Sequence, residues 1–375
     1  MKKILIISFS PIARDPRVIR QIQLLENFYQ VSVAGFGELD NRNIEYIQLN
    51  PVRVRSLLGK VFSAGKLLLG MFEQHYKNLS QVVDAKVKLQ NKNYDLILVN
   101  DVLALPLALS VGKNPKILLD AHEYSPKEFE DRFLWRLFFS KYYHYLCKEY
   151  LPKVNGMVTV CKGIADEYHS QYKIDVDVVH NAPLMQNLLP VTMRSDRVKL
   201  IHHGIATPSR NLELMIEMLS LLDNRFTLDL MLVETDPTYM KKLEAMVESN
   251  PKVRLVPPVA MQDICSVINQ YDVGVFLLPP VNFNYAHALP NKFFEFIQAR
   301  LAIAIGPSPE MAHLVVKHAC GVVANDFSKE ALAASLNALT QQQIWQFKLA
   351  SHQAANELHY GAGADVMLNK IKILL

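Results

Sequence analysis

The chain has 375 residues, of which half are hydrophobic and a fifth charged; this is ordinary for a soluble globular protein and excludes a mainly disordered chain. Its length predicts two domains with substantial cores. The net charge of +4, from 40 basic and 36 acidic residues, is too small to indicate nucleic-acid binding, so we expect no nucleic acid among the partners.

The four cysteines are far apart and show no CxxC spacing. They are typical of reduced, buried thiols in a cytoplasmic protein, and they indicate neither a zinc site nor a disulfide framework. The apolar run at 4–9 is too short for a signal peptide and is followed by Pro11 without a small-residue cleavage site. No uninterrupted apolar run reaches the roughly 18 residues that a membrane-spanning helix needs.

The first half alternates strand and helix patterns, which predicts a parallel, doubly wound α/β sheet. We expect strands at 4–9, 31–35, 44–49, 96–100, 117–120, 157–161 and 176–179, and helices at 18–25 and 102–109. Ligands of such sheets bind beyond the carboxyl ends of the strands, so the loops 8–17, 100–101 and 120–125 are candidate binding segments. The first loop lacks the glycines of a dinucleotide fingerprint, which removes the main support for a nicotinamide-dependent dehydrogenase.

Two segments of this half, 53–81 and 129–153, mix basic residues with aromatic and aliphatic ones. In the first, the basic residues include Arg53, Arg55, Lys60 and Lys66. One interpretation is that both segments lie at the surface of an anionic membrane while the body of the protein stays in water. The alternative is a helix packed between domains with solvated basic edges.

The second half repeats this architecture after a linker without clear periodicity at 184–197. Strands are predicted at 199–203, 228–233, 253–256, 273–278, 302–305 and 321–323, with a helix at 212–221. We therefore expect two Rossmann-like domains, 1–190 and 191–350, facing each other across a central cleft. The helical segment 351–375 is expected to cross back to the first domain.

The stretch 285–301 predicts a helix that begins near Pro290 and carries separate apolar and polar faces. Its polar stripe contains Asn291, Lys292, Glu295 and Gln298. A helix start with a lysine beside it can hold a diphosphate, and Glu295 can accept two sugar hydroxyls. The alternative is an amphipathic helix with a solvated polar face.

Taken together, the motifs of the chain resemble those of the GT-B glycosyltransferases, specifically the retaining, metal-independent family 4 (glycosyltransferase group 1). The matching segments, which cover nearly the whole chain, are Asp15-Pro-Arg17, Asp120-Ala-His-Glu123, the strand at 158–161 with Gly163-Ile-Ala165, His180-Asn-Ala-Pro183, Gly204 with Arg210-Asn211, Pro290-Asn-Lys-Phe-Phe-Glu295 and Gly306-Pro-Ser-Pro-Glu-Met311.

This resemblance implies an enzyme that transfers a hexosyl group from a nucleotide diphosphate sugar, with a UDP-sugar as the expected donor, to a glycan or lipid-linked acceptor in surface polysaccharide synthesis. It implies retention at the anomeric carbon, no metal or other cofactor, and a cytoplasmic enzyme, peripheral on the inner face of the membrane. The implied catalytic residues are His122, Glu123, Arg210 and Lys292. The implied donor-binding residues are Gly204, Arg210, His287, Ala288, Leu289, Asn291, Lys292 and Glu295, and the acceptor-side residues are Arg14, Asp15, Arg17 and Asp101.

Two departures from the family pattern leave alternatives open. His287 stands where the family often has a first glutamate, eight positions before Glu295, and only Arg210 represents the usual two basic residues after Gly204. The missing glutamate favours one alternative, an inactive nucleotide-sugar-binding subunit. A nucleotide-sugar 2-epimerase, which uses the same two-domain fold, is a second alternative. His122 is alternatively a core histidine at a strand end, and Asp120 and Glu123 are the candidate bases.

Overall fold

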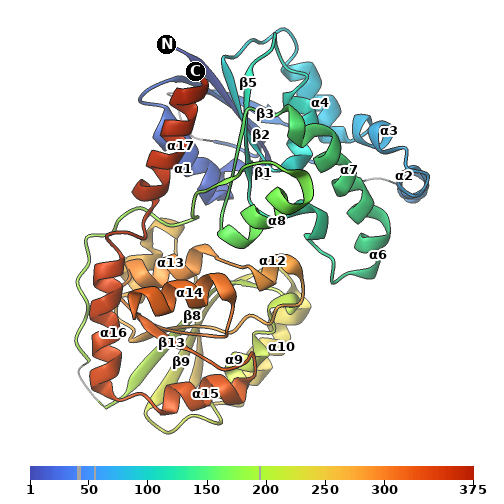
Figure 1. Cartoon of the computed structure of the whole chain (residues 1–375). Helices are drawn as coiled ribbons and strands as arrows, with labels where there is room; N and C mark the ends of the chain where they lie inside the picture. Colours follow the sequence, from blue (N-terminus) through green and yellow to red (C-terminus); the bar gives the residue numbers. More distant parts are fainter. Residues whose placement is uncertain (40–43, 55, 194–195) are drawn as a thin grey trace. The chain divides into compact units, whose positions relative to one another are not determined.

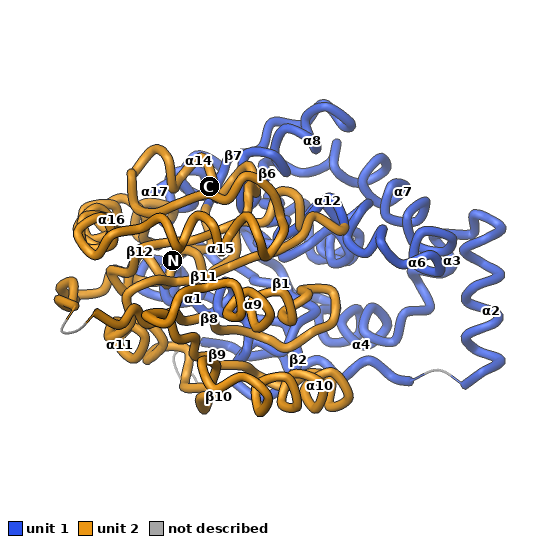
Figure 2. The backbone as a smooth tube through the Cα atoms, turned by 90° about the horizontal axis from the view of Figure 1, so that it is seen from below, with its two compact units in different colours: residues 1–179, 282–284, 364–375 blue, residues 180–281, 285–363 orange. Residues whose placement is uncertain are grey.

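The computed structural model describes residues 1–39, 44–54, 56–193 and 196–375, which form two compact units (Figures 1 and 2). Unit 1 comprises Met1–Val179, Asn282–Asn284 and Ala364–Leu375, and unit 2 comprises His180–Val281 and Tyr285–Gly363. Sequence analysis placed the boundary at residue 190. Arg55 of the basic segment and residues 194–195 of the predicted linker lie outside the described residues.

The described part of unit 1 is built on a parallel sheet with the strand order β3-β2-β1-β4-β5-β6-β7. All strands predicted in this half are present: β1 (Lys3–Pro11), β2 (Gln30–Phe36), β3 (Glu45–Leu49), β4 (Leu96–Asn100), β5 (Lys116–Ala121), β6 (Gly156–Thr159) and β7 (Asp177–Val178). The order runs outward in opposite directions from β1 and β4. The carboxyl ends of these two strands therefore form the switch point at which such sheets bind ligands.

Some helices of unit 1 cover this sheet, and others lie at the periphery of the unit, away from it (Figure 1). They are α1 (Pro16–Leu25), α2 (Leu57–Leu68), α3 (Phe72–Lys77), α4 (Ser80–Lys88), α5 (Leu105–Ala108), α6 (Phe133–Trp135), α7 (Lys141–Tyr150) and α8 (Lys162–Tyr172). The helix predicted at 102–109 is broken into a 3-10 turn, Val102–Ala104, and the single turn α5. Pro106 explains the break, because proline lacks an N–H donor and fits only the first turn of an α-helix.

The aromatic segment 129–153 is not one helix. A π-helical stretch, η4 (Arg136–Ser140), separates α6 from α7. Tyr142, Leu146 and Cys147 of α7 are buried, whereas Phe133 and Leu134 of α6 are exposed. The segment therefore combines core residues with a short exposed apolar part.

Unit 2 repeats the parallel α/β arrangement, and the strand order among its described residues is β10-β9-β8-β11-β12-β13. Its strands are β8 (Val198–Ala206), β9 (Phe226–Glu234), β10 (Val253–Val256), β11 (Val273–Phe276), β12 (Ala302–Ile305) and β13 (Gly321–Val323). Its helices are α9 (Glu213–Met218), α10 (Pro237–Glu248), α11 (Ile264–Ile268), α13 (Asn291–Gln298), α14 (Pro309–His318), α15 (Lys329–Asn337) and α16 (Gln341–Ala354). α12 (Phe283–Ala286) and α17 (Tyr360–Leu374) contain residues of both units. The switch point of this sheet lies between β8 and β11.

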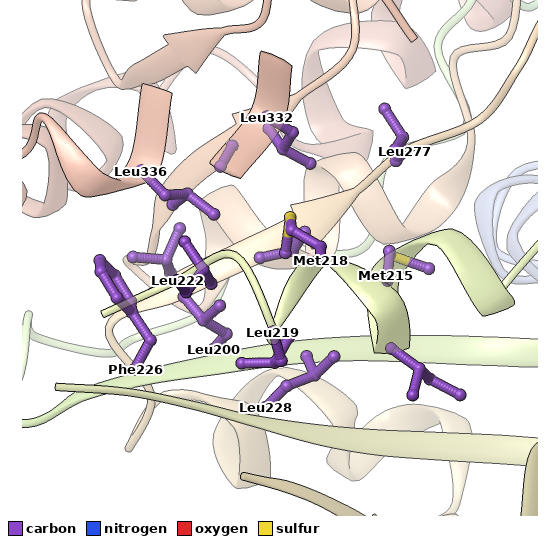
Figure 3. Packing of buried hydrophobic residues seen from close by; sticks show 14 of the residues in the cluster. Leu200, Met215, Met218, Leu219, Leu222, Phe226, Leu228, Leu277, Leu332 and Leu336 are labelled. Carbon is purple, nitrogen blue, oxygen red and sulfur yellow. The ribbon is translucent and has the colours of Figure 1, made fainter. Parts of the chain in front are cut away.

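Each unit has its own hydrophobic core. In unit 2, α9 and α15 contribute Met215, Met218 and Leu336 to a cluster that also contains Leu200 of β8 and Leu228 of β9 (Figure 3). In unit 1, the core includes residues from the far end of the chain.

The last helix supplies those residues. Met367 and Ile371 of α17 are buried in the core cluster formed by β1, β4 and α1. Sequence analysis expected the segment 351–375 to cross back to the first domain, and residues 364–375 pack in unit 1. Within the described ranges, no helix is both long enough and apolar enough to cross a bilayer.

Candidate functional site

In unit 2, two cationic groups lie over the bare backbone of Gly204 in β8. A Cβ atom on Gly204 would lie 2.9 Å from Lys292 Nζ and 3.2 Å from Arg210 Nη1. Gly204 also has a φ of +130°, which L side chains rarely adopt. Lys292 comes from the first turn of α13, and Arg210 from the 3-10 turn Pro208–Arg210 that follows β8. Residues predicted to bind one ligand are therefore close together.

Lys292 is buried, and its ammonium group is held by His202 and Phe276. His202 Nδ1 lies 2.9 Å from the carbonyl oxygen of Val275, which only an N–H can donate to, so His202 Nε2 is the acceptor for Lys292 Nζ at 3.2 Å. Lys292 Nζ also lies 4.4 Å from the centre of the Phe276 ring. Burial, and then repulsion by Arg210, holds the pKa of Lys292 well below its ordinary value. An anion placed beside this amine would stabilise its charged form.

Glu295, one turn further along α13, is paired with a second buried histidine. Its Oε2 atom lies 3.3 Å from His203 Nε2, and the two side chains are 9% and 5% exposed. Burial, followed by repulsion from Lys292 and Arg210, lowers the pKa of His203 to about 3. His203 is therefore neutral at physiological pH. A role of Glu295 in binding a ribose stays a prediction, because little of this carboxylate is open to a ligand.

The start of α13 differs slightly from the predicted one. Pro290 is the N-cap rather than the first helical residue, and no side chain caps the helix. Asn291 has a buried Oδ1 atom without a hydrogen-bond donor among the described residues. In the preceding turn the backbone N–H of Ala288 donates to Tyr285, and Leu289 is buried. The uncapped helix start and the unused oxygen of Asn291 leave polar groups that a ligand can engage.

His287 has a carboxylate beside it, although not from its own segment. Its Nδ1 atom lies 3.5 Å from Oε1 of Glu310, a residue in the first turn of α14. The two side chains are partly buried. An acid is therefore present near the position at which the sequence pattern lacked one.

In unit 1, a cavity of about 310 Å³ lies at the switch point of the sheet. It is lined by Ser8, Phe9, Ser10, Asn100, Asp101, Leu103, His122, Glu123, Ser125, Glu128 and Tyr143. These residues come from the three loops that the sequence singled out, together with Leu103, Glu128 and Tyr143. Hydroxyl, amide, imidazole and carboxylate groups of this kind are suited to binding the hydroxyl groups of a sugar.

Asp101 and His122 form the polar centre of this cavity. Oδ1 of Asp101 accepts a hydrogen bond from the backbone N–H of His122 at 3.0 Å, and Nε2 of His122 lies 3.0 Å from Oδ1 of Asn100. Asp101 has φ +66° and ψ 153°, a region used almost only by glycine and costing about 1–3 kcal/mol. Such strain is typical of functional sites.

Glu128 is the most perturbed carboxyl group of this cavity. Burial, with smaller contributions from Glu123 and Asp101, raises its pKa to about 8. Glu128 is therefore mainly protonated at neutral pH and can donate a hydrogen bond into the cavity. Glu123 is exposed.

The predicted acceptor-side residues of the first loop fall into two groups. Arg17 is buried and donates through Nε and Nη2 to both oxygens of Asp120, each at 2.7 Å, and through Nη1 to the carbonyl of Val179. Asp15 caps α1 by accepting from the backbone N–H groups of Arg17 and Val18. Only Arg14 is exposed. Arg17 and Asp15 therefore stabilise the fold of unit 1. Asp120 is fully buried and is poorly placed to act as a base.

A larger hollow, of about 660 Å³, lies elsewhere in unit 1. It is lined by residues 86–87, 89–93 and 110–113, which precede β4 and β5. Because ligands of parallel sheets bind at the carboxyl ends of the strands, the smaller cavity at the switch point is the better candidate site.

The sequence predicts no site role for four polar residues that the structure places at these two sites: His202, His203, Glu128 and Glu310. The histidines lie inside a predicted strand and resemble ordinary strand residues, so only their contacts distinguish them. Over the described ranges, no three His, Cys, Asp or Glu side chains gather in a way that could hold a metal ion.

Comparison with solved structures identifies the fold. No family model matches the sequence, and no curated protein matches it. Sucrose-phosphate synthase from Thermosynechococcus elongatus aligns with 100% of this chain and 99% of its own, with a TM-score of 0.76 and 13% identity.

Two further glycosyltransferase structures are similar over almost their full lengths. A TarM variant from S. aureus, in complex with fondaparinux, alpha-GlcNAc-glycerol and UDP, has a TM-score of 0.72 and 11% identity, with 99% of each chain covered. WaaG, a glycosyltransferase involved in lipopolysaccharide biosynthesis, has a TM-score of 0.67 and 13% identity, with 97% of this chain and 99% of that chain covered. The chain has the α/β fold of these proteins, the GT-B glycosyltransferase fold.

Proposed function

We propose that the protein is a glycosyltransferase that moves a hexosyl group from a UDP-sugar to a glycan or lipid-linked acceptor. The observation that carries the proposal is the pair of cations, Lys292 and Arg210, that lie over Gly204 at the end of β8. With the uncapped start of α13, they make a site suited to a diphosphate.

The proposed donor chemistry uses this pair of cations. As the anomeric bond breaks, negative charge develops on the leaving diphosphate, and fixed positive groups in a water-poor site stabilise it. Lys292 is buried and its position is fixed by His202, so little reorganisation is needed. We propose that Lys292 and Arg210 supply this stabilisation without a metal ion.

The proposed acceptor chemistry uses the cavity of unit 1. His122 and Asp101 present polar groups there that can orient a sugar hydroxyl, and protonated Glu128 can donate to a sugar oxygen. Asp120 is occupied by Arg17, which favours a retaining reaction in which the leaving phosphate itself accepts the acceptor proton. Glu123 remains the alternative base.

The biological setting is part of the same proposal. We propose a cytoplasmic enzyme of surface polysaccharide synthesis that works at the inner face of the membrane. The fold shared with WaaG, a glycosyltransferase involved in lipopolysaccharide biosynthesis, supports this setting.

A nucleotide panel tests the donor site. UDP is expected to raise the melting temperature of the protein more than GDP, ADP or CMP, because a ligand that binds only the folded state stabilises it. Lys292→Ala should abolish the effect of UDP, whereas Lys329→Ala, a lysine paired with Glu217 on the surface of unit 2, should retain it. An unchanged UDP shift in Lys292→Ala would overturn the assignment of the donor site.

Turnover tests the reaction class. Mass spectrometry should detect transfer to a glycan acceptor, or slow hydrolysis of the UDP-sugar without one, and addition of EDTA should leave the rate unchanged. Conversion of UDP-GlcNAc to its 2-epimer without acceptor would support the epimerase instead. UDP binding without any turnover would support a binding subunit.

A further inference from the structure

Helix α2 exposes an apolar face rather than burying it. The exposed apolar residues of α2 and its C-cap, here called the apolar face, are between 59% and 79% exposed: Leu57, Leu58, Val61, Phe62, Leu68 and Leu69. At about 100° per residue they fall within an arc of about 140°. An ordinary surface helix places such an arc against the core of the protein. Helix α2 instead exposes this arc to solvent.

The other side of α2 holds the helix on unit 1. Ser63 Oγ lies 3.1 Å from Nδ1 of the buried His75 in α3, and Leu67 is the buried apolar residue of the helix. Figure 2 shows α2 at the periphery of unit 1, remote from the β-sheet. The exposure of the apolar face therefore does not result from an unattached segment.

The charged residues of α2 itself, Lys60 and Lys66, are both basic. Between Asn50 and Glu73 the sequence contains no acidic residue. Lys60 and Lys66 flank the arc on its two sides, about 60° and 40° beyond its edges. Among the described residues neither ammonium group has a hydrogen-bond or salt-bridge partner. Lysines at these positions can extend to phosphate groups while the apolar face enters the acyl region.

A second exposed apolar patch adjoins this helix. α2 contacts η4, which continues α6, and Phe133 and Leu134 of α6 are each 66% exposed. The guanidinium group of Arg136 lies 5.9 Å from the centre of the Phe133 ring. From Arg132 to Lys148 the sequence again contains no acidic residue.

We propose that α2, with α6 beside it, is a docking surface that lies in the interface of an anionic phospholipid bilayer. A protein partner would require polar groups that form hydrogen bonds around an apolar centre, whereas this face is aliphatic and aromatic with unpaired lysines at both edges. That combination matches an interfacial helix. The inference extends the proposed membrane setting but does not depend on the transfer reaction.

Vesicle co-sedimentation of the full chain tests the proposal. The protein should bind vesicles that contain phosphatidylglycerol and should bind pure phosphatidylcholine vesicles much more weakly. Leu58→Ser/Phe62→Ser should lower binding at least about tenfold, since each large apolar side chain contributes strongly to partitioning. The matched control Val316→Ser/Leu349→Ser removes two exposed apolar side chains of unit 2 and should bind like the unchanged protein.

Insertion of α2 into the bilayer is measured separately from binding of the protein to vesicles. In Phe62→Trp, tryptophan emission should shift to the blue on anionic vesicles and be quenched by brominated acyl chains. Lys60→Gln/Lys66→Gln should reduce the preference for phosphatidylglycerol. Hydrolysis of a soluble UDP-sugar should be unaffected in Leu58→Ser/Phe62→Ser, so loss of docking and loss of the reaction are distinguishable.

Three results would overturn the proposal. One is absence of binding to phosphatidylglycerol vesicles at low salt, and another is equal binding by Leu58→Ser/Phe62→Ser and the unchanged protein. The third is a dimer in sedimentation velocity that this variant dissociates, which would assign the face to a second copy of the chain.

Discussion

Gly204 is the residue at which the proposed diphosphate site is most easily tested. A methyl group there would meet Lys292 Nζ at 2.9 Å and Arg210 Nη1 at 3.2 Å, so Gly204→Ala must displace one or both cations. We expect the affinity for UDP, measured by calorimetry, to fall about tenfold, which corresponds to about 1.4 kcal/mol. The control is Gly65→Ala in α2, where the added methyl group would meet no atom within 4 Å outside the local helix backbone. This variant should bind UDP with unchanged affinity. Equal affinities in both variants would contradict the placement of the diphosphate.

Glu128 predicts how stability depends on pH. Its pKa is raised to about 8 in the folded protein from 4.5, so the folded state binds more protons than the unfolded state between these values. The free energy of unfolding therefore falls as the pH rises from about 4.5 to 8. The stabilisation that protonated Glu128 contributes is present in full below pH 4.5, its pKa in the unfolded state. It is lost above pH about 8, its pKa in the folded state.

Glu128→Gln removes this titration without a large change of shape. Denaturant unfolding should give similar stabilities for variant and unchanged protein near pH 4.5. At pH 9 the variant should be more stable, by at most about 5 kcal/mol for a shift of this size. Parallel stability curves across this pH range would contradict the role of Glu128 as a buried, protonated carboxyl group.

The candidate site could be predicted from the sequence only in part. Lys292, Arg210 and Gly204 could be found because helix starts and strand ends are marked by proline, glycine and charged residues. His202 and His203 could not, since one faces Lys292 and the other Glu295 only after β8 and α13 have packed together. Long-range contacts of this kind leave no periodic signal along the chain.

At the scale of elements, α13 shows how a polar stripe can be misread. Its polar residues looked like either a ligand site or a solvated face, yet Lys292, Glu295 and Gln298 are all buried. Gln298 serves neither purpose: Nε2 donates to the carbonyls of Ala355 and Leu358, and Oε1 accepts from the backbone N–H of Gln186. This side chain joins the region after β7 to the end of α16.

Gln298→Leu should therefore destabilise unit 2. The substitution leaves two buried carbonyls and one partly buried N–H group without these partners. Each such loss costs about 1–3 kcal/mol if no water replaces the bond. We expect a loss of about 2–5 kcal/mol in the free energy of unfolding, measured with denaturant. Gln346→Leu, an exposed position on α16, should change stability by less than about 0.5 kcal/mol. A Gln298 variant as stable as this control would show that the side chain is dispensable.

The strands could be predicted from the sequence, whereas the ends of the short helices could not. Strands of a parallel sheet are buried on both faces, so they appear as continuous apolar runs, and all the predicted ones are present. The segments 102–109 and 129–153 are also apolar, but Pro106 and the π-helical stretch η4 divide them. Apolar composition alone does not determine where such a segment breaks.

At the scale of the molecule, described residues of each unit form a hydrophobic cluster of their own, and these two clusters share no residue. The core of unit 1 is completed by residues of α17, although the segment directly before them, Tyr285–Gly363, belongs to unit 2. Unit 1 cannot be complete until the last residues of the chain are available. We therefore expect two unfolding transitions that respond to different changes.

Ile371→Ala and UDP should each shift the temperature of a different unfolding transition. Ile371 is fully buried in the core of unit 1, so its truncation should cost about 2–5 kcal/mol and lower one calorimetric transition by roughly 5–10 °C. Ile373→Ala, on the same helix but 84% exposed, should have almost no effect. UDP at about 100 times its Kd should raise the other transition, which corresponds to about 2.7 kcal/mol. If Ile371→Ala and UDP both shifted one shared transition, the two units would unfold as one cooperative body. The assignment of UDP to unit 2 would then need a direct binding measurement with the Gly204→Ala variant.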